Sequence, residues 1–117
     1  KEVRKRVRDT VVRLTGELGL AFGEIAVLTT RTATRDALLG EPIDGCPLTR
    51  WEQRSEEAVL CETVHRTKGL EKMAVILVDQ SEEPNEVLLY VGASRAVASL
   101  TVVGSMAVGE ALGLVGD

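Results

Sequence analysis

The sequence of 117 residues has few of the residue types that build metal sites, disulfide frameworks or membrane spans. It contains one histidine and two cysteines, Cys46 and Cys61, with no C-x-x-C pair. That pattern predicts neither a zinc site nor a disulfide framework, and two free thiols in a reducing cytosol are expected. No apolar run approaches the roughly 18 residues that a membrane-spanning helix needs, and no signal peptide opens the sequence. We therefore expect a cytoplasmic protein with no membrane partner and no metal cluster of its own.

Aromatic residues and an excess of basic charge are also lacking. Aromatic side chains make up 3% of the chain, so Val, Leu, Ala and Ile must form most of the core. The formal net charge is −4 and the isoelectric point is about 5.1. Because a free-standing nucleic-acid binder is usually basic, any contact with DNA is expected to be local and shared with a partner domain.

Hydrophobic periodicity in the remaining sequence predicts one α/β domain over residues 1–117. Uninterrupted apolar character over 73–78 is typical of a strand covered on both faces, which indicates a parallel sheet with helices on each side. An alternating pattern over 58–64 also suits a strand, and 40–57 is expected to be a loop with one short strand. Because the chain starts at Lys1 without Met, we expect it to be a piece of a longer protein. The other expected elements are an amphipathic helix over 1–18, a strand over 24–29, a helix over 35–39 capped by Thr34, a helix from Pro84 to Ala98, a strand over 100–104 and a helix over 106–114.

Two polar stretches lie where a predicted strand meets a predicted helix or a second strand. The first is Thr63-Val64-His65-Arg66-Thr67-Lys68-Gly69-Leu70-Glu71. In it Gly69 permits a positive φ, the basic side chains can meet phosphates, and Glu71 can accept a hydrogen bond from a ribose hydroxyl. The second is Leu89-Tyr90-Val91-Gly92-Ala93-Ser94-Arg95-Ala96, in which Arg95 stands among small residues. On composition alone, a solvated surface turn and a solvent-exposed arginine explain the two stretches equally well or better.

The two stretches together resemble helicase motifs. Residues 63–71 resemble the H-x-x-K-G-L-E of motif V in Rep/UvrD-type superfamily I helicases, and residues 90–96 resemble the Y-V-A-x-[ST]-R-A of motif VI. They occur in the family's order with a strand between them. A looser match to motif IV covers residues 25–31, although Thr30 stands where many relatives have an aromatic residue that stacks on adenine. The resemblance implies a RecA-like domain of the P-loop NTPase type, the second and C-terminal domain of an ATP-dependent DNA helicase.

The resemblance also implies a division of roles at a composite ATP site. An N-terminal RecA-like domain of the same polypeptide would supply the P-loop and bind ATP with Mg²⁺. This domain would contribute Arg95, and Arg31 with it, as arginine fingers at the γ-phosphate. Nucleotide contacts would come from Glu71 at the ribose, with Gly69, Lys68 and Gly92 nearby. Contacts to single-stranded DNA would come from four residues of motif V: His65, Thr63, Thr67 and Arg66.

The sequence lacks any G-x-x-x-x-G-K-[ST] pattern that could cradle phosphates by itself. We therefore expect the isolated chain to hydrolyse no ATP and unwind no DNA. A second hypothesis stays open, in which the chain is a non-hydrolysing RecA-like interaction or regulatory module of a larger protein. A third keeps the ATPase and replaces DNA by RNA, because nothing in the sequence reads bases. Tyr90, one of three aromatic residues, is expected in the core.

Overall fold

Five parallel strands form the centre of the computed structural model, which describes residues 2–113. Every strand pair is parallel, and the order across the sheet is β2-β3-β1-β4-β5. This agrees with the α/β class expected from the uninterrupted apolar strands. The strands are β1 (Ile25–Thr29), β2 (Leu48–Thr49), β3 (Val59–Thr63), β4 (Lys72–Asp79) and β5 (Ala96–Gly104).

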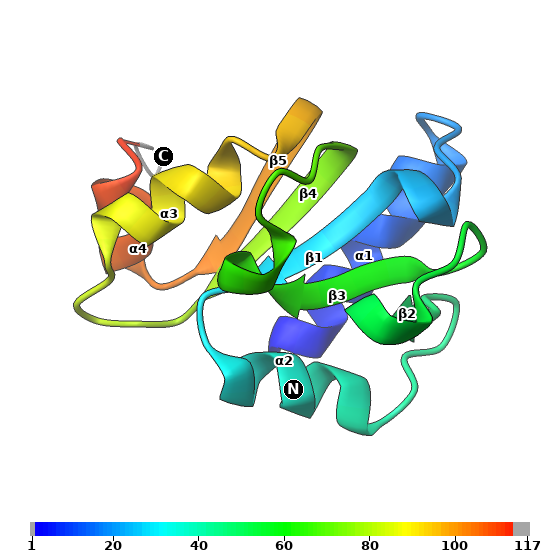
Figure 1. Cartoon of the computed structure of the whole chain (residues 1–117), viewed down its shortest axis with the longest axis horizontal. Coiled ribbons are helices and arrows are strands. Elements are labelled where there is room, and N and C mark those ends of the chain that lie inside the picture. Colours follow the sequence, from blue (N-terminus) through cyan, green and yellow to red (C-terminus); the bar gives the residue numbers. More distant parts are fainter. Residues whose placement is uncertain (1, 114–117) are drawn as a thin grey trace.

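Helices cover both faces of this sheet, as Figure 1 shows. One face packs against the two N-terminal helices and the other against the two C-terminal helices. Three short 3-10 turns precede β1, β3 and β4. The helices and turns are α1 (Glu2–Gly16), α2 (Thr32–Gly40), α3 (Glu86–Ala93), α4 (Met106–Ala111), η1 (Phe22–Glu24), η2 (Trp51–Gln53) and η3 (Val64–Thr67).

The core is divided by the sheet into two layers, and β1 supplies both. Ile25 and Val27 point into the layer beneath α1 and α2, whereas Ala26 and Leu28 point into the layer beneath α3. All four are fully buried. Burying one Leu, Ile or Val side chain stabilises the fold by about 1.5–3 kcal/mol, so a strand buried on both faces holds the two layers together.

The first helix confirms the predicted amphipathic pattern. Val7, Val11 and Leu14 of α1 are fully buried against the sheet. Leu18 was expected on the same face, but the helix ends at Gly16 and Leu18 is 57% exposed. Arg4 of α1 donates hydrogen bonds to carbonyl oxygens at the end of α2 and just beyond it, Ala37, Leu38, Glu41 and Pro42. A cation at the C-terminus of a helix satisfies its free carbonyl groups and its dipole, so α1 and α2 are joined.

The predicted boundaries of two helices were wrong. The second helix begins at Thr32, two positions before the expected cap Thr34. The helix expected from Pro84 to Ala98 begins after Asn85, whose side chain accepts a hydrogen bond from the Leu88 N–H, and ends at Ala93. Residues 96–104 instead pair with β4. Pairing with a neighbouring strand here outweighs the helix propensity of the first few residues.

Burial in α3 and β3 also departs from the sequence pattern. Val87 was expected on the inward side of its helix, but it is 74% exposed, and Leu89 and Gly92 are the buried residues of α3. Residues 59–63 include the polar Glu62 and Thr63, yet all five are buried because helices or turns cover both faces of β3. One of the five is Glu62, a carboxylate in the interior.

No helix in the described part of the chain is long and apolar enough to cross a bilayer. Both cysteines are buried free thiols. Burial raises the pKa of Cys46 to about 11 and that of Cys61 to about 12, so neither thiol is reactive at neutral pH.

Candidate functional site

Motif V runs from the carboxyl ends of the strands, which we call the carboxyl edge of the sheet, to their amino ends, which we call the amino edge. Thr29 of β1 pairs with both Thr63 at the end of β3 and Val78 near the end of β4, so these three residues lie at the same level, at the carboxyl edge of the sheet. Lys72, which begins β4, lies six residues before Val78. At about 3.3 Å per residue it is about 20 Å away, at the amino edge. The start of motif V, predicted to contact nucleic acid, and its end, predicted to contact the nucleotide, therefore lie at opposite edges.

At the amino edge the structure brings motif V and motif VI together. The backbone N–H of Lys72 donates to the carbonyl oxygen of Arg95 at 2.9 Å. Arg95 follows the end of α3, in the turn before β5, and not inside a helix as expected. Glu71 precedes Lys72 and has an exposed side chain. The predicted nucleotide residues Glu71 and Arg95 thus lie beside one another.

The Arg95 side chain has a feature that the fold itself does not explain. The residue is half-buried, and its Nε is buried with no hydrogen-bond partner among the described residues. A buried N–H that lacks a partner is costly, more so on a charged group. A phosphate oxygen, which accepts the fork of guanidinium hydrogens, would satisfy it.

The turn that leads to this edge depends on Gly69. Its φ is +81°, a backbone angle that glycine adopts readily and other residues rarely do. A Cβ on Gly69 would meet no atom within 4 Å, so the backbone angle and not the available space restricts this position. Lys68 is exposed beside it, and Lys72 donates from Nζ to the Gly23 carbonyl oxygen at 2.6 Å. That contact fixes the end of the turn on the sheet.

Gly92 is not a nucleotide-facing residue, contrary to the prediction. It is buried in α3, and a Cβ there would lie 2.9 Å from Leu77 Cδ1 and 3.0 Å from Val64 Cγ2. The absence of a side chain lets α3 approach β4 and the motif V segment. Tyr90, expected in the core, is 53% exposed, and its hydroxyl donates to the Ala111 carbonyl oxygen at 3.1 Å.

At the carboxyl edge only two of the four predicted nucleic-acid residues are accessible. Thr67 is fully buried, and its hydroxyl donates to the carbonyl oxygens of Val64 at 3.0 Å and Thr63 at 3.3 Å. Thr63 is 4% exposed. Their side chains serve the local fold and are not free for a strand of DNA, which corrects the prediction. His65 and Arg66 of η3 are exposed.

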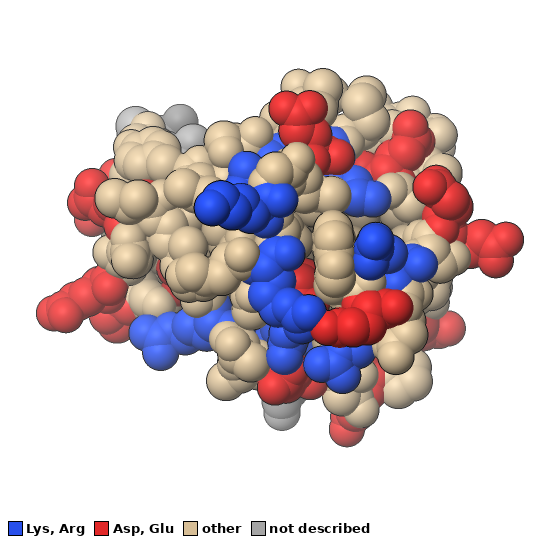
Figure 2. All heavy atoms as spheres, viewed as in Figure 1, with Lys and Arg blue, Asp and Glu red and all other residues tan. Residues whose placement is uncertain are grey.

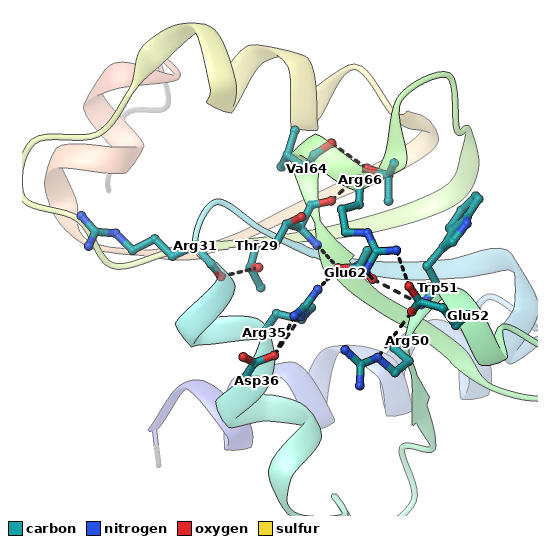
Figure 3. Close-up of polar contacts among 12 residues, drawn as sticks. Thr29, Arg31, Arg35, Asp36, Arg50, Trp51, Glu52, Glu62, Val64 and Arg66 are labelled. Atoms are coloured by element: carbon teal, nitrogen blue, oxygen red, sulfur yellow. Dashed lines mark hydrogen bonds and ion pairs between the residues drawn. The ribbon is translucent and has the colours of Figure 1, made fainter.

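Arg31 lies at this carboxyl edge as well, which separates it from Arg95. It follows the end of β1, and its Nε donates to the Ser81 hydroxyl, just beyond the end of β4, at 3.3 Å. The length of β4 from Lys72 to Asp79 puts about 23 Å of strand between the two arginines. Figure 3 shows the Arg31 side chain extending away from the polar network around Glu62. The structure therefore does not bring Arg31 and Arg95 to one phosphate, because they lie at opposite edges.

A network of charged residues at the carboxyl edge was not anticipated from the sequence. Its centre is the fully buried Glu62, whose Oε1 accepts from Arg35 Nη1 at 2.5 Å. The other oxygen, Oε2, lies 3.5 Å from Arg66 Nη1. Arg66 also pairs with the exposed Glu52, which is 3.5 Å from Arg50 (Figure 3). We call these five residues the Glu62 network: Arg35, Arg50, Glu52, Glu62 and Arg66.

The buried carboxylate stays ionised because its partners outweigh the cost of burial. Burial raises the pKa of Glu62, but hydrogen bonds from Arg35 and from the backbone N–H groups of Thr63 and Trp51 lower it by more, so the pKa lies below its ordinary value. The same contact with Glu62, and a further one with Asp36, raises the pKa of Arg35. The Arg66 guanidinium likewise lowers the pKa of Glu52. One buried anion thus fixes α2, η2 and the start of η3 relative to one another.

One signal in the sequence could have indicated this network. Glu62 stands in a strand next to other buried strands, and a carboxylate there requires a cation. The pattern over 58–64 predicts a strand but does not show that Glu62 is buried. The partner Arg35 lies 27 residues away, and only the crossing of α2 over β3 brings it close.

Comparisons with known proteins agree with these motifs. Residues 58–103 match the model of the UvrD-like helicase C-terminal domain family. Among solved structures, the chain is similar to the C-terminal domain of a possible DNA helicase from Lactobacillus plantarum WCFS1, with a TM-score of 0.72 and 26% sequence identity. That similarity covers 88% of this chain but only 66% of the other, so the chain spans slightly less than two thirds of it. A search of curated proteins returned no match. The segment 58–103 includes both motif V and motif VI, so this part of the chain is similar to the C-terminal domain of UvrD-like helicases.

Proposed function

We propose that this chain supplies one wall of a composite ATP site in an ATP-dependent DNA helicase. The opposite wall would be an N-terminal RecA-like domain of the same polypeptide, which contains the P-loop. The observation that carries the proposal is the buried Nε of Arg95, which has no hydrogen-bond partner within residues 2–113 and lies next to Glu71 at the amino edge of the sheet. Its guanidinium fits an anionic ligand that this chain alone cannot hold.

The roles of the residues follow from the amino edge. Arg95 would donate to the γ-phosphate and neutralise charge that develops during phosphoryl transfer. Glu71, exposed beside it, would accept a hydrogen bond from the ribose hydroxyl. Gly69 would set the backbone conformation of the turn, and Lys68 would add a positive charge to it. ATP with Mg²⁺ would be bound mainly by the P-loop domain, where the metal neutralises the phosphates.

Single-stranded DNA would contact the carboxyl edge. His65, Arg66 and Arg31 are exposed there, at the opposite edge from Arg95. Figure 2 shows Lys and Arg side chains forming a band down the middle of the viewed face, although the net charge of the chain is −4. We therefore move Arg31 from the nucleotide to the DNA in this proposal. Opening and closing of the ATP site at the amino edge would then shift single-stranded DNA that is held about 20 Å away, at the carboxyl edge.

The test compares ATP turnover by the 117-residue chain with turnover by the chain joined to a P-loop domain. We expect no turnover above background from the chain alone, and DNA-stimulated turnover from the joined protein. Turnover by the isolated chain would contradict the composite site. A joined protein that binds ATP but never hydrolyses it would favour the non-hydrolysing module.

A further inference from the structure

Arg66 lies between two carboxylates that differ in their burial and in their other hydrogen-bond partners. Its Nη1 lies 3.5 Å from Glu62 Oε2, and its Nη2 donates to Glu52. Glu62 is fully buried, whereas the Glu52 side chain is 49% exposed and the Arg66 side chain 40%. The guanidinium therefore has one buried anchor and one partner at the surface.

Three further hydrogen bonds hold the buried anchor, Glu62, in place. Glu62 also accepts from Arg35 at 2.5 Å, from the Thr63 N–H at 2.9 Å and from the Trp51 N–H at 3.3 Å. Glu52, in contrast, lies on the three-residue turn η2. It has a second cation within reach, since Arg50 Nε is 3.5 Å from its Oε1. If Arg66 released Glu52, the carboxylate would keep a partner.

We propose that Glu52 occupies the place on Arg66 that a backbone phosphate of a single strand would take. Carboxylate and phosphate oxygens both accept guanidinium hydrogens, so the two anions compete for Arg66 Nη2. Glu52 turns to Arg50 when the strand binds, and Glu62 keeps Arg66 in position on η3. Binding of the strand is thereby weakened by an acidic residue of the domain itself. This inference rests on the proposed function, in which the carboxyl edge contacts single-stranded DNA.

The experiment measures binding of a fluorescent oligothymidylate to the whole chain by anisotropy at several salt concentrations. Glu52→Gln removes the competing charge and keeps the shape, and it should tighten binding about threefold, the range of an exposed ion pair. The slope of log affinity against log salt should steepen by about 0.7, as for one additional phosphate contact on a single strand. Glu57→Gln is the matched control. It removes the same charge from an exposed residue that forms no ion pair within residues 2–113, and it should change affinity by much less.

A second variant links the effect to Arg66. In an Arg66→Gln background, Glu52→Gln should no longer tighten binding, because the guanidinium for which the two anions compete is gone. Equal gains with and without Arg66, or equal gains from Glu52→Gln and Glu57→Gln, would overturn the competition. If the parent chain binds the oligonucleotide but Glu52→Gln binds no tighter, only this inference fails. If neither the parent chain nor Glu52→Gln binds the oligonucleotide, and Arg66→Gln leaves the anisotropy unchanged, the proposed contact of the carboxyl edge with DNA fails as well.

Discussion

The two edges of the sheet hold their arginines in opposite ways. At the amino edge, Arg95 has a buried Nε without a partner in the described part of the chain. At the carboxyl edge, Arg66 is already neutralised by Glu52 and Glu62, and Arg35 by Glu62 and Asp36. A guanidinium that the domain leaves unsatisfied indicates a ligand from outside, whereas a paired one stabilises the domain and must exchange partners before it can bind anything else.

The largest expected effect lies at the amino edge. In a protein that joins this chain to its P-loop domain, Arg95→Ala should lower the ATP turnover number by about 10³-fold. Nucleotide affinity should change little, because the γ-phosphate contact matters most in the transition state. Steady-state turnover and equilibrium binding of a fluorescent nucleotide separate the two quantities. Turnover within a factor of two of the parent would count against this role for Arg95.

At the carboxyl edge the large effect should be on stability. Glu62→Gln leaves Arg35 buried without its main anion, and the free energy of unfolding should fall by about 3 kcal/mol, at the low end for a broken buried pair because Asp36 remains. Urea denaturation followed by Trp51 fluorescence measures it. Glu52→Gln is the control and should leave the unfolding midpoint nearly unchanged. A Glu62→Gln variant as stable as the parent would show that the network does not hold this edge.

The sequence predicted the parts of the fold that depend on local pattern. It missed those that depend on contacts between elements that are far apart in the sequence. The apolar run 73–78 predicted a covered strand, and residues 74–78 are buried in β4; the spacing of Val7, Val11 and Leu14 predicted a helix. The end of α3 at Ala93 was missed, because the short apolar residues 96–98 fit either element until β4 is present to pair with the segment.

The candidate site was predicted in the same uneven way. Motif order brought out Glu71 and Arg95, and the structure brings them together. Nothing local in the sequence shows that Thr63 and Thr67 point inward or that Arg31 ends at the other edge, since both follow from strand register. The pairing of Arg35 with Glu62 depends on the same three-dimensional arrangement.

The acid sensitivity of the domain should also come from the carboxyl edge. Because the pKa of Glu62 in the folded chain lies below the ordinary glutamate value of about 4.3, its ionisation stabilises the fold above that pH. This contribution should be lost as the pH falls through the lowered pKa. Urea midpoints measured from neutral pH down to strongly acidic pH should therefore fall more steeply for the parent than for Glu62→Gln. Parallel curves would mean that Glu62 is not the group responsible.

The smallest effect concerns the turn between the two edges. Gly69→Ala should destabilise the chain by about 1–2 kcal/mol, because a residue with a Cβ resists the φ of +81°. Gly40→Ala is the control, since Gly40 ends α2 without a positive φ, and helix propensity should make that variant no less stable than the parent. Thermal denaturation compares them, and equal loss in both would remove the special role of this turn.

The central claim is that Arg95, and not Arg31, faces the nucleotide. The most direct measurement is a crystal structure of the chain joined to its P-loop domain, with a non-hydrolysable ATP analogue and Mg²⁺ bound. The account predicts an Arg95 nitrogen within about 2.7–2.9 Å of a γ-phosphate oxygen, with Arg31 at the far edge of the sheet. A γ-phosphate bound by Arg31, with Arg95 directed elsewhere, would contradict it.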